Sequence, residues 1–188
     1  MRRAARSLHV SVLGVCLAIF VGSVSLPAQE GGVGRLEFRV KPYAAGVFID
    51  GKYQGPATRF GWWIWFALPA GEHEVTLKDP RYHDFSTKVT IVAGQATIIK
   101  ESMRPLPPPH PPYGTLRIQG GSSGYNAVYL NGRFMGHVDE FNNVFQGLMT
   151  NPGEYALTVV SIPGETELNE KVKLEEGKTT RVHVGAVR

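Results

Sequence analysis

A nine-residue pattern that occurs twice, at residues 47–55 and 128–136, limits most strongly how this chain can fold. Each copy is an apolar, strand-prone run, then Asp-Gly or Asn-Gly, a basic residue, an aromatic residue, one further residue and a glycine. Both dipeptides favour the positive φ angles of a type I′ turn, which joins two twisted antiparallel strands. We therefore predict structural hairpin turns at Asp50-Gly51 and at Asn131-Gly132.

Each predicted hairpin carries an aromatic pair beside its turn. With a two-residue loop, Phe48 lies opposite Tyr53, and Tyr129 lies opposite Phe134. Other segments repeat at an offset that drifts from 80 to 83, namely 34–36 with 114–116, 69–75 with 151–157, and 89–95 with 172–178. The repeat indicates a duplicated β domain with small insertions in its loops.

The first 28 residues have the three parts of a secretory signal peptide. Three arginines precede an apolar run from about residue 10 to 24, and small residues follow it. We predict cleavage after Ala28, with Ser25 as the alternative site. An uncleaved membrane anchor is the other interpretation, although the run is short for a full span. Either way, the sequence predicts an exported protein of the periplasm, the cell surface or the medium.

Cleavage would change both the charge and the redox chemistry of the chain. Cys16 is the only cysteine and lies in the apolar run, so the mature protein has no disulfide and depends on packed cores. Removing Arg2, Arg3 and Arg6 lowers the formal net charge from +4 to about +1. The basic character therefore gives little support to a nucleic-acid partner.

A proline-rich segment at residues 104–113 divides the remaining chain into residues 34–103 and 114–187. Consecutive prolines favour a stiff, extended spacer, and the alternative is a ligand for a proline-recognising partner. We expect the two halves to fold independently, because such a spacer carries few contacts across it.

Apolar residues alternate with polar ones along the predicted strands. Leu36, Phe38 and Val40 are separated by charged residues, and segments 73–77 and 85–91 show the same period of two. About six or seven short strands in each half predict a two-layer sandwich. The fold class is thus all-β, with two small antiparallel β-sandwich domains in tandem after a signal peptide.

The order of these motifs resembles the PEGA domain, a small β-sandwich repeat of bacterial surface and envelope proteins. The resemblance rests on a Gly-x-Leu opening strand, the Asp-Gly or Asn-Gly hairpin, a later Pro-Ala-Gly-Glu (69–72) or Pro-Gly-Glu (152–154), and a terminal x-x-Gly turn. It covers 34–103 and 114–187, although neither half keeps the four letters Pro-Glu-Gly-Ala intact. The resemblance implies a non-catalytic module whose ligand is generally undefined.

The largest difference between the two halves lies at residues 62–66. Alternation from Ile64, interpreted as a core position, places Trp62 and Phe66 on the buried side and Trp63 and Trp65 on the outer face. Exposed aromatic side chains are typical contact sites for sugar rings or protein partners. We expect Trp63 and Trp65 to form a contact patch, unless a neighbouring loop, the linker or the second domain covers them.

Three other motifs carry weaker signals. The Gly-x-Ser-x-Gly at 120–124 lacks the strand–turn–helix context of a nucleophile elbow. His73 is interpreted as a core or edge histidine, and His83 and His137 do not recur as zinc ligands in both halves. Residues 139–143 are interpreted as an ordinary acidic loop rather than a calcium site.

We therefore expect neither enzymatic activity nor a cofactor or metal ion. The sequence favours an exported binding or scaffolding protein that contacts an envelope polysaccharide or an envelope protein through Trp63 and Trp65. A purely structural spacer and, less favoured, a hydrolytic or metal-dependent enzyme are the alternatives. Any membrane contact would be through an uncleaved signal peptide.

Overall fold

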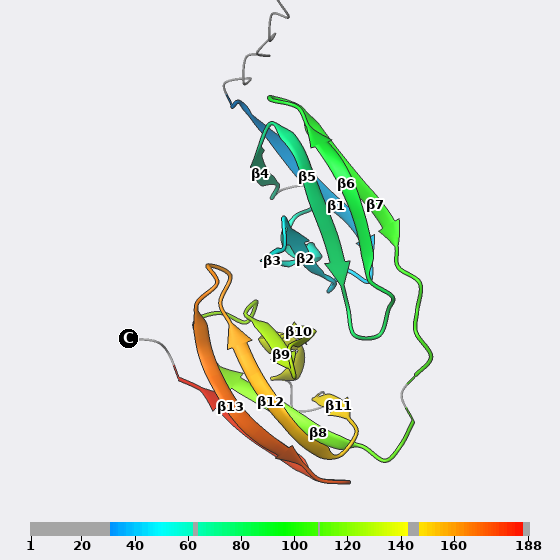
Figure 1. The fold of residues 1–188 in the computed structure, drawn as a ribbon, viewed down its shortest axis with the longest axis vertical. Helices are drawn as coiled ribbons and strands as arrows, with labels where there is room; N and C mark the ends of the chain where they lie inside the picture. Colours follow the sequence, from blue (N-terminus) through cyan, green and yellow to red (C-terminus); the bar gives the residue numbers. More distant parts are fainter. Residues whose placement is uncertain (1–30, 62–63, 109, 143–146, 186–188) are drawn as a thin grey trace, which may run out of the picture.

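The computed structural model describes residues 31–61, 64–108, 110–142 and 147–185. The predicted signal peptide, Trp62 and Trp63 lie outside the described residues. The described chain is nearly all β and forms two units of seven strands each. Strands β1–β7 make the first unit and β8–β14 the second, with the proline-rich segment between them (Figure 1).

The first unit contains a four-stranded and a three-stranded sheet. The larger sheet has the order β3-β2-β5-β6 and the smaller β4-β1-β7. The strands are β1 Val33–Lys41, β2 Gly46–Ile49, β3 Lys52–Pro56, β4 Phe66–Pro69, β5 Gly71–Lys78, β6 Phe85–Ile91 and β7 Ala96–Ser102. A 3₁₀ turn, η1 Ala57–Arg59, follows the first hairpin.

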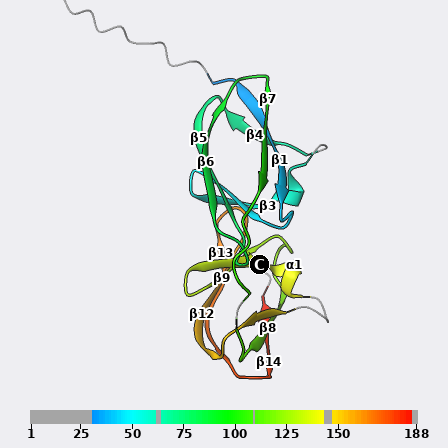
Figure 2. The same ribbon diagram turned by 90° about the vertical axis from the view of Figure 1, so that its right-hand side faces the viewer.

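The second unit repeats this topology strand for strand, in the orders β10-β9-β12-β13 and β11-β8-β14. Its strands are β8 Gly114–Gly120, β9 Ala127–Leu130, β10 Arg133–His137, β11 Leu148–Thr150, β12 Gly153–Val160, β13 Thr166–Leu174 and β14 Thr179–Val184. A four-residue helix, α1 Val138–Phe141, takes the place of η1 (Figure 2). The acidic segment interpreted as a loop is therefore helical at Asp139–Phe141, and Asn143 lies outside the described residues.

Each unit buries the facing sides of its two sheets. Leu36, Phe38 and Val40 are buried while the charged residues between them face outward, as the alternation predicts. Val75 and Leu77 cover them from the opposite sheet. The equivalent core of the second unit contains Leu116, Ile118, Val128, Leu157, Val159 and Val172.

The strand pairing differs from the prediction in one respect. The pairs β1–β7 and β8–β14 are parallel, whereas the other ladders are antiparallel. A parallel pair needs a long crossover connection. Here the crossover is supplied by the five strands that lie between the first and the last strand of each unit.

The two units meet head to head at their hairpin ends. Strand β5 runs toward the junction from the first unit and β12 from the second, so equivalent ends face each other (Figure 1). The linker leaves β7 beside the junction and passes along the second unit to reach β8 at its far end.

Both ends of the linker are held by hydrogen bonds. The backbone amide of Leu106 donates to the carbonyl of Arg81 at 2.8 Å, and Tyr82 forms a β-bridge with Pro105. Near the other end, the side-chain amide of Asn151 donates to the carbonyl of Pro112 at 3.2 Å. These contacts attach the segment to the first unit at one end and to the second unit at the other.

Candidate functional site

The two hairpin turns have the same backbone geometry. Asp50 and Asn131 both have a φ of 49°, and the glycines that follow them, Gly51 and Gly132, both have a φ of 76°. Positive φ at both central positions is what a type I′ turn requires. The aromatic pairs Phe48–Tyr53 and Tyr129–Phe134 lie opposite each other beside these turns.

The first turn residue of each hairpin also anchors it to the next strand of its sheet. A carboxylate oxygen of Asp50 accepts a 3.0 Å hydrogen bond from the amide of Glu74, and the side-chain oxygen of Asn131 accepts a 2.8 Å bond from that of Ala156. Asp50 in the first unit and Asn131 in the second therefore have the same structural role.

His73 is an edge residue that links the first turn to the start of β5. Its Nδ1 lies 2.7 Å from Oδ2 of Asp50, and its Nε2 lies 3.0 Å from the carbonyl oxygen of Pro69. Both partners are acceptors, so only the protonated imidazolium, with two N–H donors, satisfies both. The hydrogen bond to Asp50 raises the pKa of His73, and the same bond lowers the pKa of Asp50. In the second unit, the Tyr155 hydroxyl donates instead to the carbonyl of Asn151.

The outer face of the sheet β4-β1-β7 holds the exposed aromatic side chain predicted from the sequence. Trp65 is 47% exposed, and the guanidinium carbon of Arg35 lies 5.1 Å from the centre of its ring. A cation–π contact of this kind orients an aromatic side chain without burying it. Trp63, the other predicted contact residue, lies outside the described residues.

The alternation inferred for residues 62–66 is wrong at Ile64. This side chain is 57% exposed, and Phe60 is buried in the core, where it contacts Phe38 and Phe66. Strand β4 begins only at Phe66, which is half-buried, so residues before it are not held to a strand period. Strand alternation cannot be extended into the preceding loop.

A groove lies at the C-terminal end of the same outer face. It has a volume of about 670 Å³, and its floor is formed by residues 38–41 of β1 and 100–102 of β7. Its wall is formed by Tyr43, Ala57, Thr58 and Gly61. Tyr43 is 63% exposed. This groove was not predicted from the sequence.

The junction between the two units is built from equivalent residues of the two hairpins. Phe48 and Tyr53 pack against Phe134, with ring centres 5.4 and 5.6 Å apart, and Ala127 completes the buried cluster. The hydroxyl of Tyr53 donates to the carbonyl of Tyr125 at 2.9 Å. The expectation of few contacts between the halves is therefore wrong, because the hairpins rather than the spacer make the contacts.

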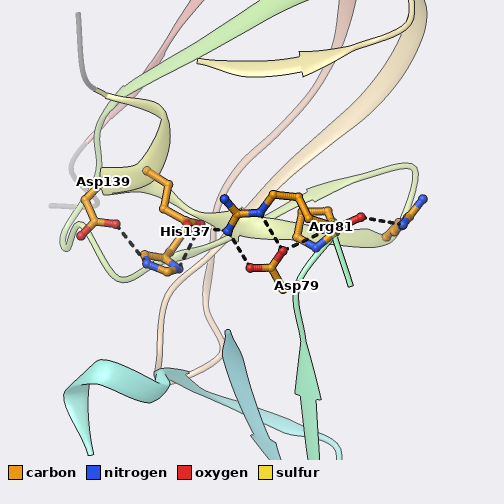
Figure 3. A network of polar contacts seen from close by, with 7 residues as sticks. Asp79, Arg81, His137 and Asp139 are labelled. Atoms are coloured by element: carbon orange, nitrogen blue, oxygen red, sulfur yellow. Dashed lines mark hydrogen bonds and ion pairs between the residues drawn. The ribbon is translucent and has the colours of Figure 1, made fainter. Parts of the chain in front are cut away.

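A polar network lies beside this aromatic cluster (Figure 3). Asp79 is buried and accepts two hydrogen bonds from the guanidinium of Arg81, at 2.9 and 2.7 Å. The same guanidinium lies 3.8 Å from a carboxylate oxygen of Glu140 in α1, across the junction. Arg133 of the second unit reaches the carbonyl of Pro80 at 3.4 Å. The β5–β6 loop of the first unit thus binds the hairpin and helix of the second.

Burial shifts the titration of two residues in this network. It raises the pKa of Glu140 to about 7 and lowers the pKa of His137, whose ring lies 3.4 Å from Asp139 and 3.5 Å from Glu140. The sequence analysis interpreted His137 and Glu140 as loop residues and gave no role to Asp79 and Arg81. Asp79, Arg81 and Glu140 are not repeated between the halves, so the comparison of the two halves, which located the turns, gave no signal for their network.

The remaining motifs have structural partners. The amide of Ser122, in the Gly-x-Ser-x-Gly segment, donates to Glu167 at 3.1 Å, and its hydroxyl also donates to this carboxylate. In the described part of the chain, no group of three histidine, cysteine or acidic side chains is placed to hold a metal ion. No helix among residues 31–185, outside the gaps given above, is long and apolar enough to span a bilayer.

Comparison with known protein families gives a match for the first unit. A model of the PEGA domain matches residues 34–106. A search of the curated proteins found no match. Among solved structures, the Bacillus anthracis TIE protein aligns with 84% of this chain at 15% identity and a TM-score of 0.28. The chain spans about a third of that protein's length, 33%, and a likeness this low carries no argument about function.

Proposed function

Because this chain is a PEGA-domain protein, we propose that it is a non-catalytic binding or scaffolding protein of the cell envelope. PEGA domains typically occur in exported and surface proteins, and the predicted signal peptide agrees with that setting. The proposed location is the periplasm, the cell surface or the medium. The first unit contacts a glycan or a protein partner through the exposed side chain of Trp65 together with Trp63.

The exposure of Trp65 is the observation that carries this proposal. A tryptophan side chain has a large apolar surface, and leaving nearly half of it in water is unfavourable unless a partner covers it. Arg35 holds the ring on the outer face of the sheet rather than against the core. Aromatic side chains presented in this way dominate the free energy of many contacts with proteins.

The test is the double substitution Trp63→Gln and Trp65→Thr in the mature protein. We expect retention on envelope material to be lost, while the free energy of unfolding changes by no more than about 0.5 kcal/mol. The matched control is Met149→Thr, which removes an exposed apolar side chain of the second unit. A large fall in melting temperature would instead assign the tryptophans to a core.

A structural spacer is the second candidate, and the junction between the units favours it. The aromatic cluster and the Arg81–Glu140 contact give the two units a defined relative position, as a spacer requires. Unchanged stability together with unchanged retention in the double variant would make this function the leading one.

A further inference from the structure

The groove described above lies over the outer face of the sheet β4-β1-β7. Its floor is formed by residues 38–41 of β1 and 100–102 of β7, two strands that pair in parallel. The side chains of β1 alternate between the core and the outer face, so Arg39 and Lys41 are the two that reach the groove from this strand. The volume of about 670 Å³ is within the range of about 300–1,000 Å³ that is typical of ligand pockets.

The backbone around the groove is already hydrogen-bonded. On one side, β7 pairs with β1 from Arg35 to Lys41. On the other, the amide of Phe38 donates to the carbonyl of Phe60 at 2.9 Å, and the amide of Thr58 donates to the carbonyl of Tyr43 at 3.0 Å. A ligand in the groove is therefore held by side chains and not by pairing with a strand edge.

The groove carries three cationic side chains. Arg39 and Lys41 are exposed on β1, and Lys100 of β7 lies directly beside Arg39 in the parallel register. None of the three forms an ion pair with another described residue, and the lining contains one carboxylate, that of Glu101. The groove therefore favours an anionic ligand.

An aromatic side chain lies beside these cations. Tyr43 lines the groove and is 63% exposed, and its own backbone carbonyl is held by Thr58. An exposed tyrosine offers a flat apolar face and a polar hydroxyl. Ala57 and Gly61, on the same wall, add no charge. The groove thus joins a stacking surface to a row of cations.

The second unit lacks this set of cations although it has the same fold. In its β8–β14 pair, Gln119 and His183 occupy the places of Arg39 and Lys100. Arg181, an exposed cation of β14, lies two residues earlier along its strand than His183. The sandwich itself therefore does not require cations at the positions that surround the groove.

On the premise that the first unit has the binding function given above, we propose that this groove binds an acidic polysaccharide, a chain of uronic acids. Such a chain has a carboxylate on each ring and flat, apolar ring faces. Carboxylates pair with Arg39, Lys41 and Lys100, and a sugar ring stacks on Tyr43. Residues two apart on a strand lie roughly 6.6–6.8 Å apart on one face, so the cations of β1 form a row that suits a linear polyanion.

The hydrogen-bonded backbone favours a glycan over an acidic protein segment. An extended peptide that binds a sheet gains affinity from main-chain hydrogen bonds to an open strand edge. Phe60 and β7 occupy the two sides of β1 at Phe38, so no such edge is offered there. A sugar chain needs no strand edge, because ring faces and carboxylates are recognised by side chains.

The first experiment measures the binding of two uronic acid oligomers, hexagalacturonate and hexamannuronate, to the mature protein by calorimetry. We expect at least one of them to bind, and the triple variant Arg39→Gln, Lys41→Gln, Lys100→Gln to weaken that binding by at least about tenfold, because three ion pairs are lost. The matched control removes three exposed cations that do not line the groove, by Lys52→Gln, Lys171→Gln and Arg181→Gln. Equal weakening by both triple variants, or no binding of either oligomer, would overturn the proposal.

Tyr43→Thr tests the stacking surface. We expect it to weaken binding of the uronic acid oligomer by about tenfold, with an unchanged melting temperature, because the ring is exposed. Met149→Thr, which removes an exposed apolar side chain of the second unit, is the control and should bind as the wild type does. Wild-type affinity in Tyr43→Thr would show that no sugar ring stacks in the groove.

A second experiment changes only the ligand, so the fold of the protein is untouched. Cellohexaose has the rings without the charges, and a capped hexaglutamate peptide has as many carboxylates as the uronic acid oligomers without the rings. We expect both to bind at least about tenfold more weakly than the better uronic acid oligomer. If cellohexaose binds as tightly, the cations are not used. If hexaglutamate binds as tightly, the groove recognises charge alone, and either result contradicts the proposal.

The outcomes also separate this site from the proposed function, because Trp65 does not line the groove. If neither oligomer binds while the Trp63 and Trp65 double variant loses envelope retention, the proposed function stands and the polysaccharide groove does not. If the groove variant alone loses oligomer binding while the double variant keeps its envelope retention, the groove is the binding site and the tryptophans are not.

Discussion

The hydroxyl of Tyr53 donates a 2.9 Å hydrogen bond to the backbone carbonyl of Tyr125, and this bond crosses from the first unit to the second. Burial raises the pKa of Tyr53, so its hydroxyl stays protonated and able to donate throughout the usual pH range. The ring of Tyr53 also packs against Phe134. The equivalent hairpins of the two units therefore act as each other's binding surface.

Tyr53→Phe tests whether this bond couples the units. The substitution keeps the ring but leaves the carbonyl of Tyr125 without this donor, and we expect it to lower the free energy of unfolding by about 1 kcal/mol. Denaturant unfolding followed by circular dichroism measures this change. The control is Tyr155→Phe, whose exposed hydroxyl bonds within the second unit and should matter less. An unchanged midpoint for Tyr53→Phe would contradict the coupling.

The hairpin glycines are tested by Gly51→Val and Gly132→Val. Each glycine has a φ of 76°, and a built Cβ at either position meets nothing within 4 Å. The expected loss of about 1–2 kcal/mol or more therefore comes from backbone strain alone. Gly185→Val is the matched control, because that site is equally open and lies outside the positive-φ region. Melting temperatures that fall equally in all three variants would exclude turn strain as the cause.

Features that recur in the two halves could be predicted from the sequence. The turns at Asp50 and Asn131 depend on residues that are neighbours in the sequence. The burial along β1 follows a period of two, which can also be recognised in a single sequence. The parallel pairing of β1 with β7 does not follow from either signal, because it depends on how the chain returns across the sandwich.

The parts of the site that were missed depend on contacts between distant segments. Asp79 and Glu140 lie 61 positions apart in sequence and belong to different units, and Arg81 brings them together. The groove is lined by β1, β7 and the 57–61 segment, which are brought together by packing between distant parts of the chain rather than by a local pattern. The exposure of Ile64 and Trp65 does not follow from alternation, because both residues precede β4 and lie in a loop.

The Asp50–His73 contact predicts a pH dependence of stability that is specific to the first unit. The raised pKa of His73 means that its contribution is present below its ordinary value of 6.5 and is lost as the pH rises through the higher folded-state pKa. Asp50→Asn should remove this dependence. Midpoints of urea denaturation across neutral pH give the measurement. Asn131→Asp is the control, because Tyr155, whose hydroxyl donates to the carbonyl of Asn151, takes the place of His73 in the second unit and no such dependence should arise.

Glu140→Gln tests the polar network at the junction. Burial raises the pKa of Glu140 to about 7 from 4.5, so the folded protein binds this proton more tightly than the unfolded chain does. The contribution of Glu140 to stability is therefore present below about pH 4.5 and is lost as the pH rises to about 7. Glutamine resembles the protonated acid, so Glu140→Gln should be more stable than the wild type above pH 7, by up to about 3 kcal/mol.

His137 titrates in both proteins, but its ring lies 3.5 Å from Glu140, so the difference in stability between the variant and the wild type reports the coupled titration of this pair. Burial lowers the pKa of His137, so its own contribution is lost as the pH falls below its ordinary value of 6.5, opposite to that of Glu140. The stability gap between Glu140→Gln and the wild type should close as the pH falls from 8 to 4.5. Glu176→Gln removes an exposed carboxylate with the same change in net charge and should open no gap. A variant that is less stable than the wild type at pH 8, by a deficit that shrinks toward acid, would show that Glu140 is ionised at the junction and stabilises it through Arg81. A gap that is constant with pH would show that folding does not shift the pKa of Glu140.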